Sequence, residues 1–223
     1  MEIIPVIDIM NNIAVHGMGG NREEYKPLKT VLCDSSNPID IIEKYKENGA
    51  EKVYIADLDA IMKNGDNFNI IRELPIYKIV DAGISTKKDI EYMRALKICD
   101  KLIVGTETLN DLDLLGEKDI ILSLDFKDGK LLNYELDDIL DNVNKNTPLI
   151  ILDISSVGTQ SGINKNLIKY IIDKTNNPIY IGGGIKDEND LKDAYDLGAQ
   201  GVLIATAVHK GILDLKEIIE KYG

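Results

Sequence analysis

Two aspartates stand at the ends of similar apolar runs in different halves of the chain. Asp8 closes Ile3-Ile-Pro-Val-Ile-Asp8, and Asp125 closes Ile120-Ile-Leu-Ser-Leu-Asp125. Each run is short and rich in β-branched residues, which is typical of a buried parallel strand. Carboxyl groups on opposite faces of a substrate supply acid–base catalysis, one protonating an oxygen while the other removes a proton from carbon. Asp8 and Asp125 are therefore our candidate catalytic residues; the alternative is that each caps the turn that follows it.

Apolar runs followed by glycine, alanine or threonine form a second pattern. The backbone N–H groups at a helix start carry partial positive charge, and glycine lets a ligand oxygen approach them without meeting a Cβ atom. The pattern predicts two phosphate sites, one at Gly182, Gly183, Gly184, Ala205 and Thr206, the other at Gly83, Gly105 and Thr106. Two such sites imply a substrate with a phosphate at each end and its middle over the aspartates. The alternative is that these glycines only relieve crowding between strand and helix.

The elements that position these residues recur at a spacing of about 100 residues, as internal repeats do. Leu102-Ile-Val-Gly105-Thr106 matches Val202-Leu-Ile-Ala205-Thr206, and Tyr54-Ile-Ala-Asp57 matches Ile150-Ile-Leu-Asp153. Four strand–helix units, present twice, predict an α/β fold: a (β/α)₈ TIM barrel built from a duplicated (β/α)₄ half. Without a linker rich in proline, glycine or serine, residues 1–223 are expected to form a single domain.

Hydrophobic periodicity, caps and glycines give the expected boundaries. Strands are predicted over residues 3–9, 52–57, 76–81, 101–105, 119–125, 148–153, 179–182 and 201–205. Helices are predicted over residues 38–48, 67–74, 85–96, 110–115, 135–146, 165–175, 187–197 and 214–222. Residues 16–37 are the longest connection, and long glycine-containing loops on a rigid scaffold often contact substrate.

The sequence gives weaker evidence for the remaining polar residues as parts of a functional site. His16 begins the long connection and is a candidate substrate contact. His209 is expected in a short helix after the last strand, either packed there or next to a phosphate. Asp57, Asp81 and Asp153 also end strands, so each is either a functional residue or a structural hydrogen-bond acceptor. Of these, Asp57 and Asp153 are our candidate substrate contacts. No metal site is expected, because neither histidine has ligand partners in a metal-binding spacing.

Charge and composition exclude several classes of partner. The formal net charge is −12, and nucleic-acid binding needs clustered Lys and Arg. The chain has no long apolar span for a membrane, and its two cysteines, Cys33 and Cys99, show no redox spacing. We expect a cytoplasmic protein that takes a phosphorylated small molecule and needs no cofactor.

Over nearly its whole length the sequence resembles the HisA/HisF barrel superfamily of histidine biosynthesis, which comprises an isomerase and a cyclase subunit. The motifs that carry the resemblance are Ile4-Pro5-Val-Ile-Asp8, Asn37-Pro38, Ala56-Asp57-Leu-Asp59, Gly105-Thr106, Leu124-Asp125, Asp153-Ile-Ser-Ser-Val-Gly158-Thr159-Gln-Ser-Gly162, Gly182-Gly-Gly-Ile and Ala205-Thr206. The resemblance implies the barrel, two phosphate sites and an aldose–ketose isomerisation of the Amadori type. It also implies Asp8 as base, Asp125 as acid, and Thr159 as a substrate contact.

The sequence departs from the isomerase pattern at several positions. Leu152 and Val157 replace the usual threonine and aspartate, Ser85 stands where an arginine is usual, and His16 stands where arginine or lysine is usual. Ser161, Gly162 and the segment from Ala205 to His209 are closer to the cyclase, whereas Gly182 to Ile185 are closer to the isomerase. The alternatives to an isomerase are therefore a HisF-like cyclase or lyase, which would imply a glutaminase partner, another sugar-phosphate enzyme, or a barrel that binds a metabolite without catalysis.

Overall fold

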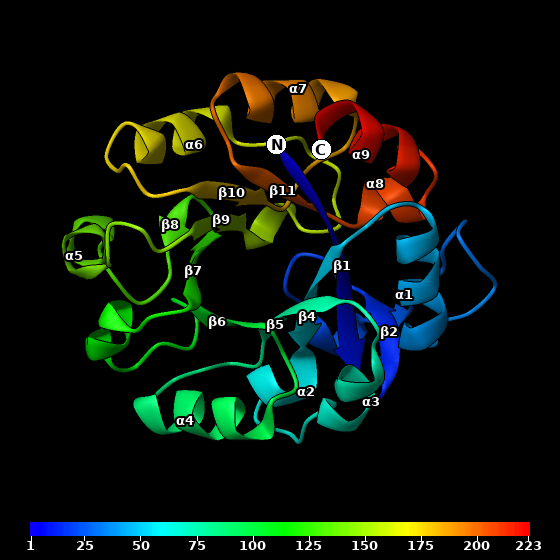
Figure 1. Ribbon diagram of the computed structural model, residues 1–223. Helices are drawn as coiled ribbons and strands as arrows, with labels where there is room; N and C mark the ends of the chain where they lie inside the picture. The colour runs from blue at the N-terminus through cyan, green and yellow to red at the C-terminus, as the bar shows by residue number, and fades with distance from the viewer.

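The computed structural model describes all 223 residues, and its centre is a closed barrel of eight parallel strands (Figure 1). In their order around the barrel these are β1 (Glu2–Met10), β4 (Lys52–Asp57), β5 (Tyr77–Asp81), β6 (Lys101–Gly105), β7 (Ile120–Lys127), β9 (Leu149–Asp153), β10 (Ile179–Gly182) and β11 (Gly201–Ile204). The barrel closes through the parallel pairing of β11 with β1. The predicted (β/α)₈ barrel is confirmed.

Helices lie outside the barrel, between the strands (Figure 1). They are α1 (Pro38–Glu47), α2 (Leu58–Ile61), α3 (Phe68–Glu73), α4 (Lys87–Leu96), α5 (Leu136–Asn142), α6 (Lys165–Ile172), α7 (Glu188–Asp196), α8 (Thr206–His209) and α9 (Leu215–Tyr222). Three 3₁₀ helices complete the set: η1 (Arg22–Glu24), η2 (Leu112–Gly116) and η3 (Ile154–Ser156). No helix combines the length and apolar character that crossing a membrane requires.

Aliphatic side chains fill the barrel and separate it from its helices. Inward positions of successive strands place Ile4, Ile79, Ile103, Ile121 and Leu203 in one buried cluster inside the barrel. A larger cluster lies between the strands and the helices, so each strand is buried on both faces. This explains why the strands are continuous apolar runs and not alternating ones.

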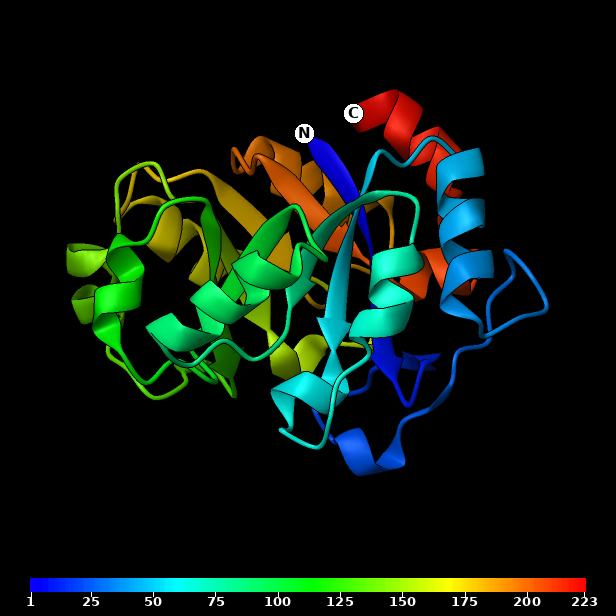
Figure 2. The same cartoon turned by 60° about the horizontal axis from the view of Figure 1, so that its bottom comes forward.

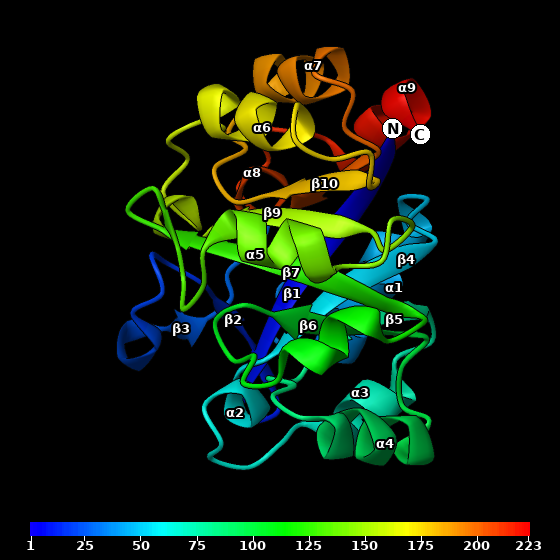
Figure 3. The same cartoon turned by 90° about the vertical axis from the view of Figure 1, so that its left-hand side faces the viewer.

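The two chain termini meet at one end of the barrel, where the Met1 amino group donates to the Tyr222 carbonyl oxygen at 2.7 Å. Figures 2 and 3 show the termini together at the end where the strands begin. The long first loop, with η1 and β3 (Lys26–Pro27), lies at the opposite end. The loops that follow the strands therefore gather at one rim.

Matching hairpins support the duplication, because the first strand of each half turns back on itself. β1 pairs antiparallel with β2 (Ile13–His16), and β7 pairs antiparallel with β8 (Lys130–Leu131). Both two-residue turns have positive φ at both positions: 52° and 61° at Asn11 and Asn12, and 52° and 76° at Asp128 and Gly129. This backbone form suits the right-handed twist of a hairpin and favours Asn, Asp and Gly.

Three predicted helices are clearly shorter than expected, and one of them, predicted over residues 165–175, ends at Ile172. Residues 110–115 were predicted as a helix, but η2 is a single 3₁₀ segment that Asp111 caps by accepting from the N–H of Asp113. The helix predicted over residues 135–146 ends at Asn142. Asn144 donates its N–H to the Leu115 carbonyl oxygen and its side-chain amide to the Gly116 carbonyl oxygen. These long-range bonds draw the chain out of the helix, which local propensity does not predict.

Candidate active site

One cavity opens at the rim where the strands end. Carboxylates from both halves line it, Asp8 from β1, Asp81 from β5 and Asp125 from β7. β1 and β7 are four strands apart in the closed barrel, so Asp8 and Asp125 enter the cavity from opposite sides. The residues predicted from the sequence that line this cavity are Asp8, Asp125, His16, Gly183, Gly184, Ala205 and Thr206.

Asp8 lies near the end of β1, beneath the first loop. Its carboxylate comes so close to Gly17 that a Cβ atom added there would lie 2.3 Å from Asp8 Oδ2. Burial raises the pKa of Asp8 to about 7; the Arg22 charge opposes this shift and the Asp81 charge adds to it. A carboxyl group with this pKa can exchange protons at neutral pH.

Asp125 is held more firmly. The Ser123 hydroxyl donates to Asp125 Oδ1 at 2.6 Å, and the N–H of Glu107 donates to Oδ2 at 2.8 Å. A Cβ atom on Gly105 would lie 2.8 Å from Oδ2, so glycine there makes room for this carboxylate. Burial raises the pKa of Asp125 to about 7, although both hydrogen bonds lower it. Two opposed carboxyl groups that titrate near neutrality meet the requirement of acid–base catalysis.

The raised pKa values predict how stability depends on pH. In the unfolded chain these groups titrate near 3.8, whereas in the folded protein they hold their protons up to about pH 7. Their contribution to stability is therefore complete below about pH 4 and is lost as the pH rises through 7. We compare the free energy of unfolding of Asp125→Asn with that of wild type. The variant's value minus the wild-type value should be roughly 2–4 kcal/mol larger at pH 8 than at pH 4. Urea denaturation at both pH values measures this, and an equal difference between the proteins at each pH would contradict it.

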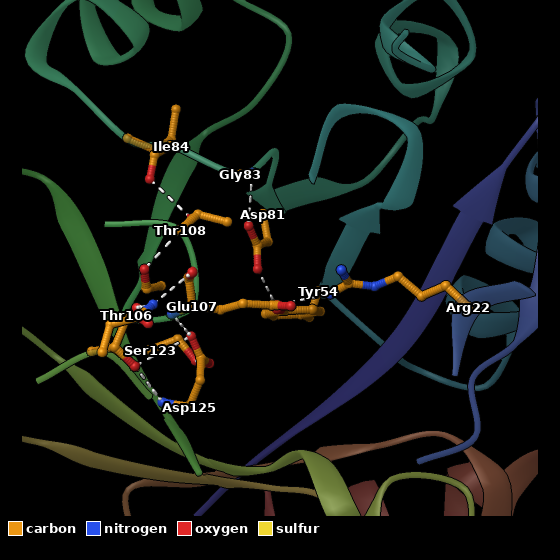
Figure 4. Close-up of polar contacts among 12 residues, drawn as sticks. Arg22, Tyr54, Asp81, Gly83, Ile84, Thr106, Glu107, Thr108, Ser123 and Asp125 are labelled. Atoms are coloured by element: carbon orange, nitrogen blue, oxygen red, sulfur yellow. Dashed lines mark hydrogen bonds and ion pairs between the residues drawn. The ribbon is translucent and has the colours of Figure 1, made fainter. Parts of the chain in front are cut away.

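A group of polar side chains lies near Asp125 (Figure 4). The Tyr54 hydroxyl donates to Asp81 Oδ2 at 3.2 Å, and the N–H of Gly83 donates to Asp81 Oδ1 at 3.0 Å. Arg22 pairs with Glu107 at 2.7 Å across the rim. Burial raises the pKa of Asp81 to about 6, and the charge of Glu107 adds to this shift. The site thus contains three buried or half-buried aspartates and one close guanidinium group.

The first loop supplies part of the cavity wall. β3 pairs with β2, which fixes the loop as an antiparallel extension over the rim, and Arg22 and Tyr25 from this loop line the cavity. The N–H of Gly19 donates to the Val157 carbonyl oxygen at 2.9 Å, so the loop also packs on the loop after β9. His16 lies at the cavity with its pKa lowered by burial and by Lys210.

The glycines after β10 shape one end of the cavity. Gly183 and Gly184 have φ values of 86° and 87°. Added Cβ atoms would lie 2.4 Å from the carbonyl oxygens of Asp153 and Gly162 respectively, so both positions require glycine. The N–H groups of Gly183, Gly184 and Ala205 donate to no group of the protein. Three amides at the cavity without acceptors are suited to an anion.

The predicted second set of amides has a different environment. The N–H of Thr106 donates to the Ser123 carbonyl oxygen at 2.9 Å, and the N–H of Ser85 donates to Asp89 Oδ2 at 3.0 Å. The N–H groups of Gly83 and Glu107 are bonded to Asp81 and Asp125, as described above. Gly83, Gly105 and Thr106 do not line the cavity. Gly182 is also outside it, within β10, where a Cβ atom would lie 2.9 Å from Leu152 Cδ1.

The other predicted contacts lie away from the cavity lining. Asp57 is fully buried, where it caps α2 through the N–H of Ala60 and accepts two hydrogen bonds from Asn67. Asp153 accepts from the Ser156 hydroxyl at 2.8 Å, and its Oδ1 is buried without a partner. Thr159 is exposed, and its hydroxyl donates to the Ser156 carbonyl oxygen.

His209 belongs to a buried hydrogen-bond chain. The Tyr45 hydroxyl donates to the Val6 carbonyl oxygen at 2.8 Å and lies 2.9 Å from His209 Nε2, which must then be the donor. The Thr30 hydroxyl, 3.1 Å from Nδ1, completes the neutral tautomer. Burial lowers the pKa of His209 to about 4. This chain ties α1 to β1 and α8 beside the cavity.

Removing the Tyr45 hydroxyl would leave two buried polar groups without partners. We expect Tyr45→Phe to lower the free energy of unfolding by about 1–3 kcal/mol, measured by urea denaturation. The matched control is Tyr92→Phe, because Tyr92 is 57% exposed on α4 and should change stability little. Equal effects of the two substitutions would show that the buried hydrogen bonds of Tyr45 do not contribute to stability.

The sequence left Asp81 open between a functional and a structural role, and it did not point to Tyr54, Glu107 or Arg22 as site residues. Asp81 ends a strand as Asp8 and Asp125 do, and Glu107 directly follows Gly105 and Thr106. The positions of Asp81 and Glu107 in the sequence could therefore have predicted that they lie at the rim. For Arg22 the sequence offered only its location in the long loop as evidence of a role in the site. Its partner, Glu107, lies 85 residues away in the sequence.

Comparisons with known proteins agree with this geometry. The profile of the family described as "Histidine biosynthesis protein" matches residues 2–214. An uncharacterized protein of Methanocaldococcus jannaschii is 62% identical over 225 residues, with both chains covered completely. The 1-(5-phosphoribosyl)-5-((5-phosphoribosylamino)methylideneamino)imidazole-4-carboxamide isomerase of the same organism is 31% identical over 240 residues, covering 99% of this chain and 98% of its own. The isomerase of that name from Methanococcus maripaludis is 28% identical over 243 residues, covering 99% of each chain. The chain therefore belongs to the histidine-biosynthesis protein family, as a relative of its HisA-type isomerases.

Proposed function

We propose that this protein is an Amadori-type isomerase that converts a phosphorylated aminoaldose into the corresponding aminoketose. The observation that carries the proposal is the opposed pair Asp8 and Asp125, each with a pKa of about 7, in one cavity that also presents three amides without acceptors. The family relationship to isomerases of this type supports the reaction class.

The reaction needs only proton transfers, and the two aspartates supply them. Asp125 protonates the ring oxygen; the C1–O bond breaks as the nitrogen lone pair forms a C1=N double bond. Asp8 removes the proton from C2, whose electrons form the C1=C2 bond of an enaminol. The enaminol hydroxyl then returns a proton to Asp125 while C1 takes one from Asp8, which leaves a ketone at C2. No electrons are gained or lost overall, and both carboxyl groups regain their starting forms.

The three amides at Gly183, Gly184 and Ala205 would hold the substrate phosphate. Binding energy from this remote group positions C1 and C2 between the carboxyl groups, which lowers the entropy cost of reaching the transition state.

The test is turnover in D₂O of aminoaldoses made from ribose 5-phosphate and primary amines. We expect NMR to show an aminoketose with deuterium at C1, because the C2 proton passes through an exchangeable carboxyl group. The ribotide of the related isomerases belongs in the same series. If the protein binds these compounds but forms no ketose and exchanges no C2 proton, the isomerase proposal is wrong.

A further inference from the structure

We propose that Arg22 is a positioning residue that makes Asp8 usable as a base, by holding a positive charge in the same cavity as a carboxylate that receives no hydrogen bond from the protein. The inference rests on the proposed function, because it concerns one of the two carboxyl groups of that reaction. Its first test measures the ionisation of the free protein, however, and needs no turnover.

Arg22 carries a positive charge that no other residue of the cavity wall duplicates. It is the only lysine or arginine that lines the cavity. The acids that line the same cavity are Asp8, Asp81, Glu107 and Asp125. A fixed cation among several acids favours the ionised form of those that it faces.

The other titratable groups around Asp8 add no second positive charge. Burial raises the pKa values of Tyr25, Tyr45 and Tyr54 above the usual 10, so these side chains are neutral at pH 7. The pKa values of His16 and His209 are both lowered by burial, so both imidazoles are mostly neutral at pH 7. Arg22 is therefore the group that can offset the burial of a negative charge on Asp8.

Asp8 and Asp125 are relieved of the cost of burial in different ways. Asp125 accepts hydrogen bonds from the Ser123 hydroxyl and the N–H of Glu107, and both lower its pKa. No hydrogen bond of this kind reaches Asp8, and the charge of Arg22 is the one influence that lowers its pKa. Without this charge, Asp8 would hold its proton more firmly than Asp125 does and would be the poorer base.

The location of the charge is set by one ion pair and by the first loop. Arg22 Nη2 donates to Glu107 Oε2 at 2.7 Å, and this is the only hydrogen bond that the guanidinium group makes within the protein. The same loop covers Asp8 at Gly17, where an added Cβ atom would lie 2.3 Å from Asp8 Oδ2. The loop thus both covers the carboxylate and carries the cation that supports its ionised form.

The first test is an NMR titration of the free protein, labelled with ¹³C at the aspartate carboxyl groups. The Asp8 signal is the one that disappears in Asp8→Asn. We expect the pKa of Asp8 in Arg22→Gln to lie about one pH unit above its wild-type value, because the opposite charge has been removed. Arg22→Lys keeps the charge and should restore most of the wild-type value. A pKa that does not rise in Arg22→Gln would overturn the inference.

Glu107→Gln separates the effect of the charge from loss of the contact. Glutamine can still accept from Arg22, but the negative charge beside the guanidinium group is gone, so the pKa of Asp8 should fall. If Arg22 only fastened the loop, both substitutions would weaken the same contact. A shift of the Asp8 pKa in the same direction in both variants would therefore contradict the inference. Arg94→Gln is the matched control, because Arg94 pairs with Glu117 outside the cavity and should leave this pKa unchanged.

The rate profile then tests the role of Asp8 as base. If its pKa rises by about one pH unit while that of Asp125 stays at about 7, the maximum of kcat/KM should move up by about half a pH unit and fall about fourfold, since fewer molecules hold an ionised Asp8 with a protonated Asp125. A higher maximum would show that Asp8 is the acid, and the role of Arg22 would be wrong. Absence of turnover with the expected NMR shifts would instead contradict the proposed isomerase.

Discussion

Replacing either Asp8 or Asp125 with asparagine is expected to lower kcat by about 10²–10⁴-fold, the usual contribution of a positioned acid or base. Asparagine keeps the shape of the side chain but can neither give nor take the required proton. The two losses should not add in the double variant, because each step of the proposed reaction needs both groups. Steady-state assays of ketose formation measure kcat and KM separately, and KM should change little.

The matched control is Asp128→Asn. Asp128 lies in the exposed turn between β7 and β8 with φ of 52°, a backbone conformation that asparagine also tolerates. This variant should keep its kcat within a few-fold of wild type. If Asp8→Asn or Asp125→Asn behaves like the control, the acid–base roles assigned to them are wrong. Loss of activity in all three variants would point to a general effect of charge on the barrel.

Activity should also be confined to a narrow range around neutral pH. One carboxyl group must be protonated while the other is ionised, and both pKa values lie at about 7. The pair therefore yields a bell-shaped rate profile whose maximum lies near pH 7.

Much of the fold follows from local sequence because a parallel barrel is locally repetitive. Each strand is buried on both faces, so it appears as a short apolar run such as Ile120 to Leu124, and each is followed by a cap or glycine. Asn37 and Pro38 begin α1 as predicted, with Asn37 Oδ1 accepting from the N–H of Ile39. The end of α5 was missed because it depends on contacts of Asn144 with η2, which no local pattern records.

The candidate site was predictable only where the barrel geometry alone determines a residue's position. Asp8 and Asp125 enter the cavity because both lie near the ends of their strands, and barrel strands end at one rim. Asp57 also ends a strand, yet its carboxylate turns to cap α2, since Asn67 offers it two donors. A position near the end of a strand predicts that a residue lies at the rim. The available hydrogen-bond partners then decide which way its side chain turns.

The two halves of the barrel show that equivalent sequence positions can differ in their hydrogen bonds. Gly105-Thr106 and Ala205-Thr206 occupy equivalent places in the two halves, and both were predicted to bind phosphate. Gly105 is the last residue of β6, whereas Ala205 lies beyond the end of β11 and its amide has no protein acceptor. Equivalent strands have thus kept the same course while the hydrogen bonds at their ends have diverged. A duplicated scaffold therefore need not keep the same hydrogen bonds in its two halves.

Gly184→Ala should be strongly damaging at the anion end of the cavity, where the free amides of Gly183 and Ala205 also lie, because it introduces two separate faults. The φ of 87° places any L-residue in the left-handed region, which costs about 1–2 kcal/mol. The new Cβ atom would also lie 2.4 Å from the Gly162 carbonyl oxygen, and such overpacking costs about 1–3 kcal/mol more. Thermal unfolding should show a Tm lowered by about 2–4 °C for each kcal/mol lost in a chain of this size. Pentyl phosphate binding should be lost as well, because the loop must move to relieve the clash.

Gly198→Ala separates these two faults. Gly198 follows α7 with the same φ of 87°, but an added Cβ atom there would meet nothing within 4 Å. It should therefore show only the left-handed cost and bind pentyl phosphate as wild type does. Equal Tm changes in the two variants would mean that the loop after β10 yields freely to the clash. Unchanged phosphate affinity in Gly184→Ala would mean that the anion does not bind at this loop, because an amide contact at that position cannot survive its displacement.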